Sequence, residues 1–298
     1  MRGFLLKSVF CGAVAFLTFF GYFAVRIWMA QPMNEEVYEL PDDVVDVFIG
    51  SSQFGCSIDV NTNYHNRLIW VSGCGPIYSL MHLRELERRE QLKNVKRIMV
   101  SFNIVNFAHT MKEEIGKAYM RCLPMAWRYT REVPLSLFEI LDVVGKYRWW
   151  GYCIGEKAPE RPPAFTHGQA WIDAIPLAEG WHRSVFTPDM YVHHRNWCDD
   201  WENVLMGPYY QIREICEKHN IKLAVVLPPL PSFCKKSLPS VAVEMYERYG
   251  QKLSGDGFTV INTRDDIADE LFADYWHLTR EGAVVYTKRF YEILNSLH

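Results

Sequence analysis

Five short runs of branched apolar residues, each ending in a polar or glycine-rich loop, constrain the fold of this chain more than any other feature. Each run is too short for a core helix and is rich in Val, Ile or Leu, which favours buried strands. The runs span residues 44–49, 67–71, 97–102, 221–227 and 258–262. Because stretches with helical spacing lie between them, the pattern predicts an α/β fold: a three-layer sandwich whose central parallel sheet is covered by helices on both faces.

The N-terminus differs in kind from the rest of the chain. Residues 8–25 carry no charge and are almost wholly apolar, with two basic residues before them and one directly after. This length is enough to cross a bilayer, and the alternative, a buried core helix, fits less well because the stretch lacks helical periodicity. We expect residues 1–30 to form an uncleaved, single-pass anchor in the inner (cytoplasmic) membrane, followed by a linker, 31–43, and an extracytoplasmic domain, 44–298.

Charge and metal-ligand spacing exclude two classes of partner. The formal net charge is −3, and no run of Lys and Arg with interleaved aromatic residues is present, so nucleic acid is not an expected partner. His193, His194, Asp199 and Asp200 are close in sequence. They lack a helical i,i+4 pair with a third ligand nearby, so we expect neither a metal site nor a cofactor.

The segment from 104 to 210 does not follow the strand pattern. It is rich in tryptophan and proline and is too long for an ordinary crossover. We therefore expect a largely helical insertion that covers the edge of the sheet formed by the carboxyl ends of the strands. Its aromatic side chains fit either a core or a sugar-binding groove, and the sequence does not distinguish the two.

Ser52, Asp274 and His277 are the candidate catalytic residues. Ser52 stands in a Gly-Ser-Ser turn after the first apolar run, and Asp274 and His277 form an Asp-x-x-His segment before the last helix. A serine hydroxyl becomes nucleophilic when an imidazole takes its proton and a carboxylate orients that imidazole. The alternative for Ser52 is a helix cap. Since chemistry in parallel sheets sits at the carboxyl ends of the strands, we expect these residues to meet there.

The chain resembles the SGNH, or GDSL-like, hydrolase superfamily on four segments in order: Gly50-Ser51-Ser52, Val71-Ser72-Gly73-Cys74-Gly75-Pro76, Ser101-Phe102-Asn103-Ile104 and Asp274-Tyr275-Trp276-His277. It is most similar to the membrane-anchored, extracytoplasmic branch that includes alginate O-acetylation and lipoteichoic-acid D-alanylation proteins. The resemblance implies an SGNH, flavodoxin-like sheet. By position in the first segment it implies that Ser52, and not Ser51, is the nucleophile.

The resemblance also implies an oxyanion hole. Its donors would be the backbone amides of Ser52 and of Gly73 or Gly75, with the side-chain amide of Asn103. The sequence does not separate the two glycines. The glycine and aspartate of the family's third block are absent here, so Asn106 is the alternative to Asn103.

The function implied by this resemblance is that of an envelope esterase or O-acyltransferase. Such an enzyme adds or removes acyl esters, most simply acetyl esters, on a cell-surface polysaccharide, and a multipass membrane acyltransferase is an expected partner. Transfer to a sugar hydroxyl and hydrolysis by water are both compatible with the sequence. The alternative from another class is a noncatalytic glycan-binding or assembly subunit that retains the fold.

Overall fold

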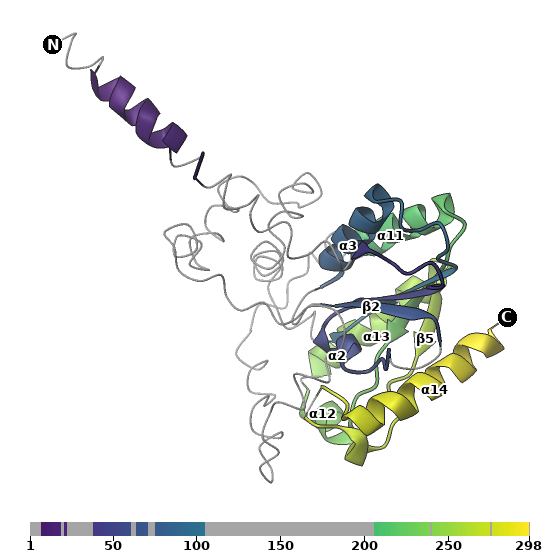
Figure 1. Ribbon diagram of the computed structural model, residues 1–298. Helices are drawn as coiled ribbons and strands as arrows, with labels where there is room; N and C mark the ends of the chain where they lie inside the picture. The colour runs from purple at the N-terminus through teal and green to yellow at the C-terminus, as the bar shows by residue number, and fades with distance from the viewer. Residues whose placement is uncertain are drawn as a thin grey trace.

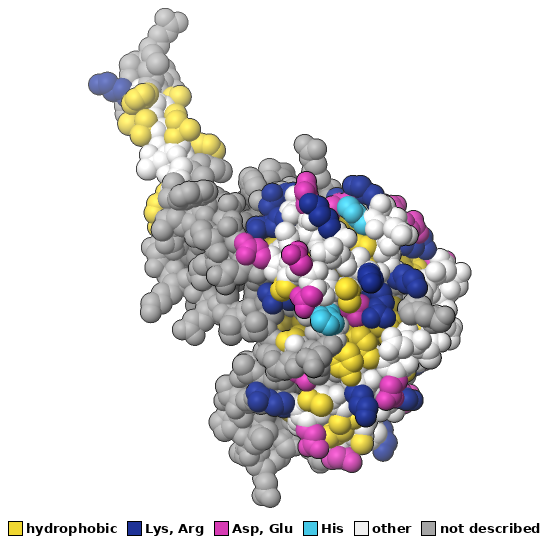
Figure 2. Space-filling model, turned by 45° about the vertical axis from the view of Figure 1, so that its right-hand side comes forward, with side chains coloured by type: hydrophobic (Ala, Val, Ile, Leu, Met, Phe, Trp, Pro, Cys, Tyr) yellow, Lys and Arg dark blue, Asp and Glu magenta, His cyan; other side chains and the backbone are white. Residues whose placement is uncertain are grey.

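The computed structural model describes the chain in separate ranges: 7–18, 21–22, 38–60, 64–70, 75–104, 206–238, 240–274 and 276–297. The first part of the predicted linker, 31–37, and nearly all of the predicted insertion lie outside these ranges. The N-terminal helix is described at residues 7–18 and 21–22, and Figure 2 shows the hydrophobic side chains on it. Among the described residues, no helix combines the length and the apolar character needed to cross a bilayer.

The described residues after the linker form a five-stranded sheet with helices around it (Figure 1). In chain order the elements are β1 (Asp46–Gly50), α2 (Ser52–Gly55), β2 (Asn66–Trp70), α3 (Pro76–Arg88), β3 (Arg97–Ser101), α11 (Gly207–Lys218), β4 (Lys222–Leu227), α12 (Ser232–Ser237), α13 (Ser240–Gly255), β5 (Thr259–Asn262), the 3₁₀ helix η6 (Asp269–Leu271) and α14 (Arg280–Ser296). The five strands stand where the apolar runs predicted them.

The sheet is wholly parallel, which confirms the prediction of an α/β fold. Its strand order is β2-β1-β3-β4-β5, so the chain first adds β2 on one side of β1 and then places the remaining strands on the other side. The order reverses between β1 and β3, where the two connections leave in opposite directions, and in open parallel sheets the carboxyl ends at such a point are the usual place for a binding site. Ser52 follows β1 and Asn103 follows β3, so both residues lie at this point.

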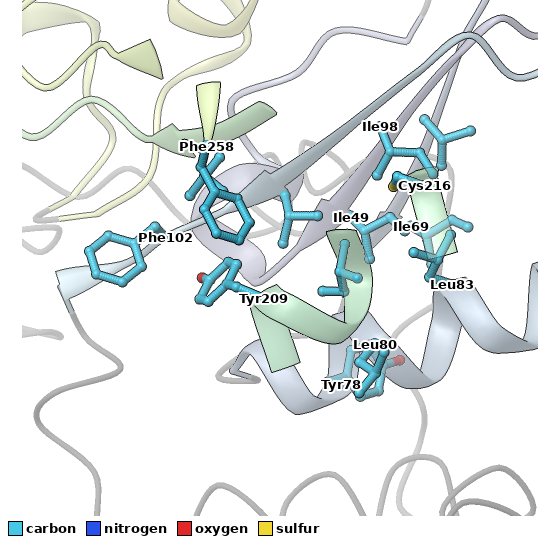
Figure 3. Packing of buried hydrophobic residues seen from close by; sticks show 14 of the residues in the cluster. Ile49, Ile69, Tyr78, Leu80, Leu83, Ile98, Phe102, Tyr209, Cys216 and Phe258 are labelled. Atoms are coloured by element: carbon cyan, nitrogen blue, oxygen red, sulfur yellow. The ribbon is translucent and has the colours of Figure 1, made fainter. Parts of the chain in front are cut away.

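Both faces of the sheet are buried. Val47 and Ile49 of β1 pack into a cluster that includes side chains of α3, α11 and α13, whereas Phe48 between them packs into a second cluster with α14. Figure 3 shows part of the first cluster, and Figure 1 shows α3 and α11 on one side of the sheet and α14 on the other. Because β1 is covered on both faces, its three successive residues Val47, Phe48 and Ile49 are all apolar rather than alternating with polar ones.

A buried ion pair joins the amino-terminal ends of β1 and β3. Asp46 is fully buried, and its carboxylate accepts two hydrogen bonds from Arg97, at 2.6 Å from Nε and 2.7 Å from Nη2. The hydroxyl of Tyr291 on α14 donates to the same carboxylate at 2.9 Å. The pair therefore links β1 and β3 to α14 at the amino-terminal edge of the sheet, which is the edge opposite to Ser52.

We expect Asp46→Ala to destabilise the fold by about 3–5 kcal/mol, because it leaves the Arg97 guanidinium without its buried counter-charge. Urea unfolding followed by tryptophan fluorescence would measure this change. The matched control is Asp43→Ala, which removes an exposed carboxylate paired with His65 at 2.9 Å and is expected to leave the unfolding midpoint unchanged. Equal midpoints for the two variants would contradict the prediction.

Candidate active site

Ser52 lies at the start of α2, in the turn that leaves the carboxyl end of β1. The residue before it, Ser51, is extended, with φ −84° and ψ −177°, and the chain then turns directly into the helix. Phe54 on this helix is fully buried in the cluster that contains α14. Its position fixes the turn that carries Ser52.

Two further contacts hold α2 in place. The side-chain amide of Gln53 donates to the backbone oxygen of Pro229, in the loop after β4, at 3.0 Å. Gly55 lies against the ring of Trp70, so closely that a Cβ there would lie 2.4 Å from a ring atom. Glycine is required at this position by the close approach of the indole, and the short helix is anchored to neighbouring parts of the sheet.

Asp274 and His277 lie in a buried loop between η6 and α14, with 1% and 3% of their surfaces exposed. One carboxylate oxygen of Asp274, Oδ1, accepts the backbone N–H groups of Trp276 and His277, each at 2.7 Å. After the loop, Thr279 caps α14 by accepting the N–H of Gly282 at 3.0 Å.

The structure brings all three candidate catalytic residues together. Nδ1 of His277 lies 2.7 Å from Oδ2 of Asp274, and Nε2 lies 3.0 Å from Oγ of Ser52. Because an ionised carboxylate only accepts hydrogen bonds, Nδ1 carries the ring proton and Nε2 is left to accept from the serine hydroxyl. This is the arrangement in which an imidazole can act as a general base toward a hydroxyl nucleophile.

Asn103, a predicted oxyanion donor, lies next to this group but its amide is engaged. Its side chain is 1% exposed, and Nδ2 donates to Oγ of Ser51 at 2.7 Å and to Oγ of Ser101 at 3.1 Å. A primary amide has two N–H bonds, so both have an acceptor in this structure. The sequence indicated Asn103 without indicating either serine as its partner.

Of the other residues predicted as oxyanion donors after Ser52 and Asn103, the structure describes only Gly75. Gly75 is buried and lies at the N-cap of α3, directly before Pro76, in an extended conformation. Gly73 and the alternative donor Asn106 are not among the residues that the structure describes. The same holds for the candidate metal-binding residues near 193–200.

Two buried tyrosines that sequence reasoning missed support the backbone beside Asn103. The hydroxyl of Tyr209 on α11 donates to the carbonyl of Ser101 at 2.8 Å, and that of Tyr246 on α13 donates to the carbonyl of Phe102 at 2.9 Å. No local pattern could have indicated these contacts, because the partners are more than a hundred residues apart in the sequence.

Two buried thiols near the site are poor nucleophiles. Burial, with a smaller contribution from the charge of Asp274, raises the pKa of Cys56 and of Cys234 well above that of an ordinary thiol. Both thiols therefore stay protonated at neutral pH. The only group among the described residues that is placed to attack with the help of His277 is therefore the Ser52 hydroxyl.

Among the described residues, no three His, Cys, Asp or Glu side chains are grouped closely enough to hold a metal ion. Comparison of the whole chain with models of known protein families and with curated protein sequences finds no match. The site is therefore interpreted from its own geometry.

Proposed function

We propose that this protein is a serine esterase or O-acyltransferase of the SGNH type, anchored in the cytoplasmic membrane, that acts on acyl esters of a cell-surface polysaccharide. The observation that carries the proposal is the contact of Ser52 Oγ with His277 Nε2 at 3.0 Å. The other ring nitrogen of His277, Nδ1, contacts Oδ2 of Asp274. The position of Ser52 and Asn103 at the reversal of strand order supports it. The order of the four sequence segments supports it as well.

In the first half of the proposed reaction, Ser52 Oγ attacks the carbonyl carbon of an ester while its proton passes to His277 Nε2. Asp274 stabilises the imidazolium through the bond to Nδ1. The tetrahedral intermediate collapses when Nε2 returns the proton to the leaving alcohol oxygen. The acyl group, most simply acetyl, is then held as an ester of Ser52.

In the second half, His277 takes a proton from the acceptor that attacks this ester. Water as acceptor makes the protein an esterase, and a sugar hydroxyl makes it a transferase. Transfer is the form that agrees with the anchored branch that the sequence resembles, in which a multipass membrane acyltransferase would supply the acyl group. The chemistry of Ser52, His277 and Asp274 is the same in both cases.

The test is labelling of the full-length protein in detergent with a fluorophosphonate, which reacts with activated serines. We expect one adduct, located by mass spectrometry on the peptide that contains Ser52, and no adduct after unfolding in urea, because reactivity depends on the folded site. Ser232 is an internal control, since its hydroxyl contacts Asp269 with no imidazole between them, and it should remain unlabelled.

A folded protein that takes no label at Ser52 would contradict the proposal. In that case the noncatalytic alternative, a glycan-binding or assembly subunit, predicts binding of an acetylated polysaccharide with no release of acetate. Label spread equally over Ser52 and Ser232 would also contradict it, because the probe would then report exposure rather than activation.

A further inference from the structure

Ser51, Asn103 and Ser101 form a buried polar cluster beside the nucleophile. Their surfaces are 4%, 1% and 3% exposed, and the amide of Asn103 bridges the two hydroxyls at 2.7 Å and 3.1 Å. Ser51 directly follows β1 and Ser101 ends β3, so the cluster lies between the carboxyl ends of these two neighbouring strands. Neither serine has a role in the reaction described above.

Gly50 makes room for this cluster. A Cβ at this position would lie 2.1 Å from Oγ of Ser101 and 2.8 Å from its Cβ. Contacts this short do not occur between real side chains. The absence of a side chain at Gly50 therefore leaves room for the Ser101 hydroxyl to contact Asn103.

The backbone that carries Asn103 is held from the opposite side. Besides the bonds from Tyr209 and Tyr246, the N–H of Phe102 donates to the carbonyl of Val226 on β4 at 2.8 Å. The ring of Phe102 stacks on that of Tyr246, with centroids 5.1 Å apart and planes 7° from parallel. With the backbone held in this way, the direction of the Asn103 amide depends on its side-chain torsions and on the two hydroxyls.

The Ser51 side chain bonds to the Asn103 amide and does not cap helix α2. A serine at an N-cap ordinarily accepts an N–H from the first turn, but the Ser51 side chain makes no such bond to α2. Its oxygen accepts instead from Asn103, by the shorter of the two contacts. Since shorter hydrogen bonds are in general the stronger ones, the bond to Ser101 is the one that costs less to break.

We propose that Ser51 is a positioning residue: it holds the Asn103 amide so that one N–H stays on Ser51 while the other leaves Ser101 and turns to the oxyanion formed at Ser52. This inference rests on the proposed function. The exchange keeps every N–H of the amide bonded before and after, since the oxyanion replaces Ser101 as acceptor.

The test is the second-order rate constant of Ser52 phosphonylation by a fluorophosphonate, whose transition state also places negative charge on an oxygen. We expect Asn103→Ala and Ser51→Ala each to lower this rate constant about 10- to 100-fold. The double variant should be no slower than Asn103→Ala alone, because Ser51 acts through the amide. The pH profile of labelling should be unchanged, since the His277–Asp274 pair is not touched.

Ser57→Ala is the matched control, because it removes another buried hydroxyl near α2, one that donates to the Gln53 carbonyl at 2.6 Å and does not contact Asn103. It should label within about threefold of wild type. If Ser51→Ala does not fold, Ser51→Thr and Ser51→Val, which have the same shape, decide the question. Fast labelling of the threonine variant and slow labelling of the valine variant is the expected result.

Three outcomes would overturn the inference. Equal rates for wild type and Ser51→Ala, or for the threonine and valine variants, would exclude a positioning role and leave the proposed function intact. Fully multiplicative effects in the double variant would mean that Ser51 does not act through Asn103. Absence of label on wild type would overturn the proposed function and this inference together.

Discussion

Replacing His277 with alanine is expected to abolish hydrolysis of p-nitrophenyl acetate, with a loss in kcat of up to about 10⁶-fold that would bring turnover to the uncatalysed background. Without the imidazole, the Ser52 hydroxyl has no base, because Nε2 of His277 is the acceptor that the structure places beside it at 3.0 Å. The measurement is acetate ester hydrolysis by the full-length protein in detergent. Circular dichroism would check that the variant is folded.

The matched control for this variant is His219→Ala. His219 also lies beside a carboxylate, with Nε2 at 2.9 Å from Glu87, but it contacts no serine in the described part of the chain. We expect its removal to leave turnover unchanged. If a folded His277→Ala variant kept more than about a hundredth of wild-type kcat, His277 would not be the base.

Asp274→Asn is expected to lower kcat by about 10⁴-fold with little effect on folding. The reason is that the two carboxylate oxygens of Asp274 have different hydrogen-bond partners. Oδ1 accepts the N–H groups of Trp276 and His277, and the amide oxygen of asparagine can keep both of those bonds. The amide nitrogen then takes the place of Oδ2 and donates to Nδ1 of His277, which moves the ring proton to Nε2 and removes the acceptor for Ser52.

The same ester assay tests this prediction, with thermal unfolding to confirm that the loop is intact. Asp269→Asn is the control, since Asp269 likewise accepts a backbone N–H, that of Ser232, while the contact of its other carboxylate oxygen is to the Ser232 hydroxyl and not to an imidazole. A loss of less than about tenfold for Asp274→Asn, with folding preserved, would show that Asp274 does not set the tautomer of His277.

The predicted oxyanion donor Asn103 shows where sequence reasoning reached its limit. Asn103 could be indicated from the sequence because the segment Ser101-Phe102-Asn103-Ile104 resembles a family block that supplies an oxyanion donor. Its engagement by Ser51 and Ser101 could not, since that contact depends on β1 and β3 being neighbours in register. The tyrosines that support it come from α11 and α13, far along the chain. Such contacts leave no local pattern.

By itself, the sequence determined the strands, their parallel arrangement and the residue types of the site, since apolar periodicity, turn residues and the Asp-x-x-His spacing are properties of neighbouring residues. Only the tertiary structure decided which strands are adjacent and which of the candidate groups touch. Ser52 and His277 are 225 residues apart, and no short-range preference sets the distance between them. Packing of α2 and α14 into one apolar cluster on the same face of the sheet brings them together.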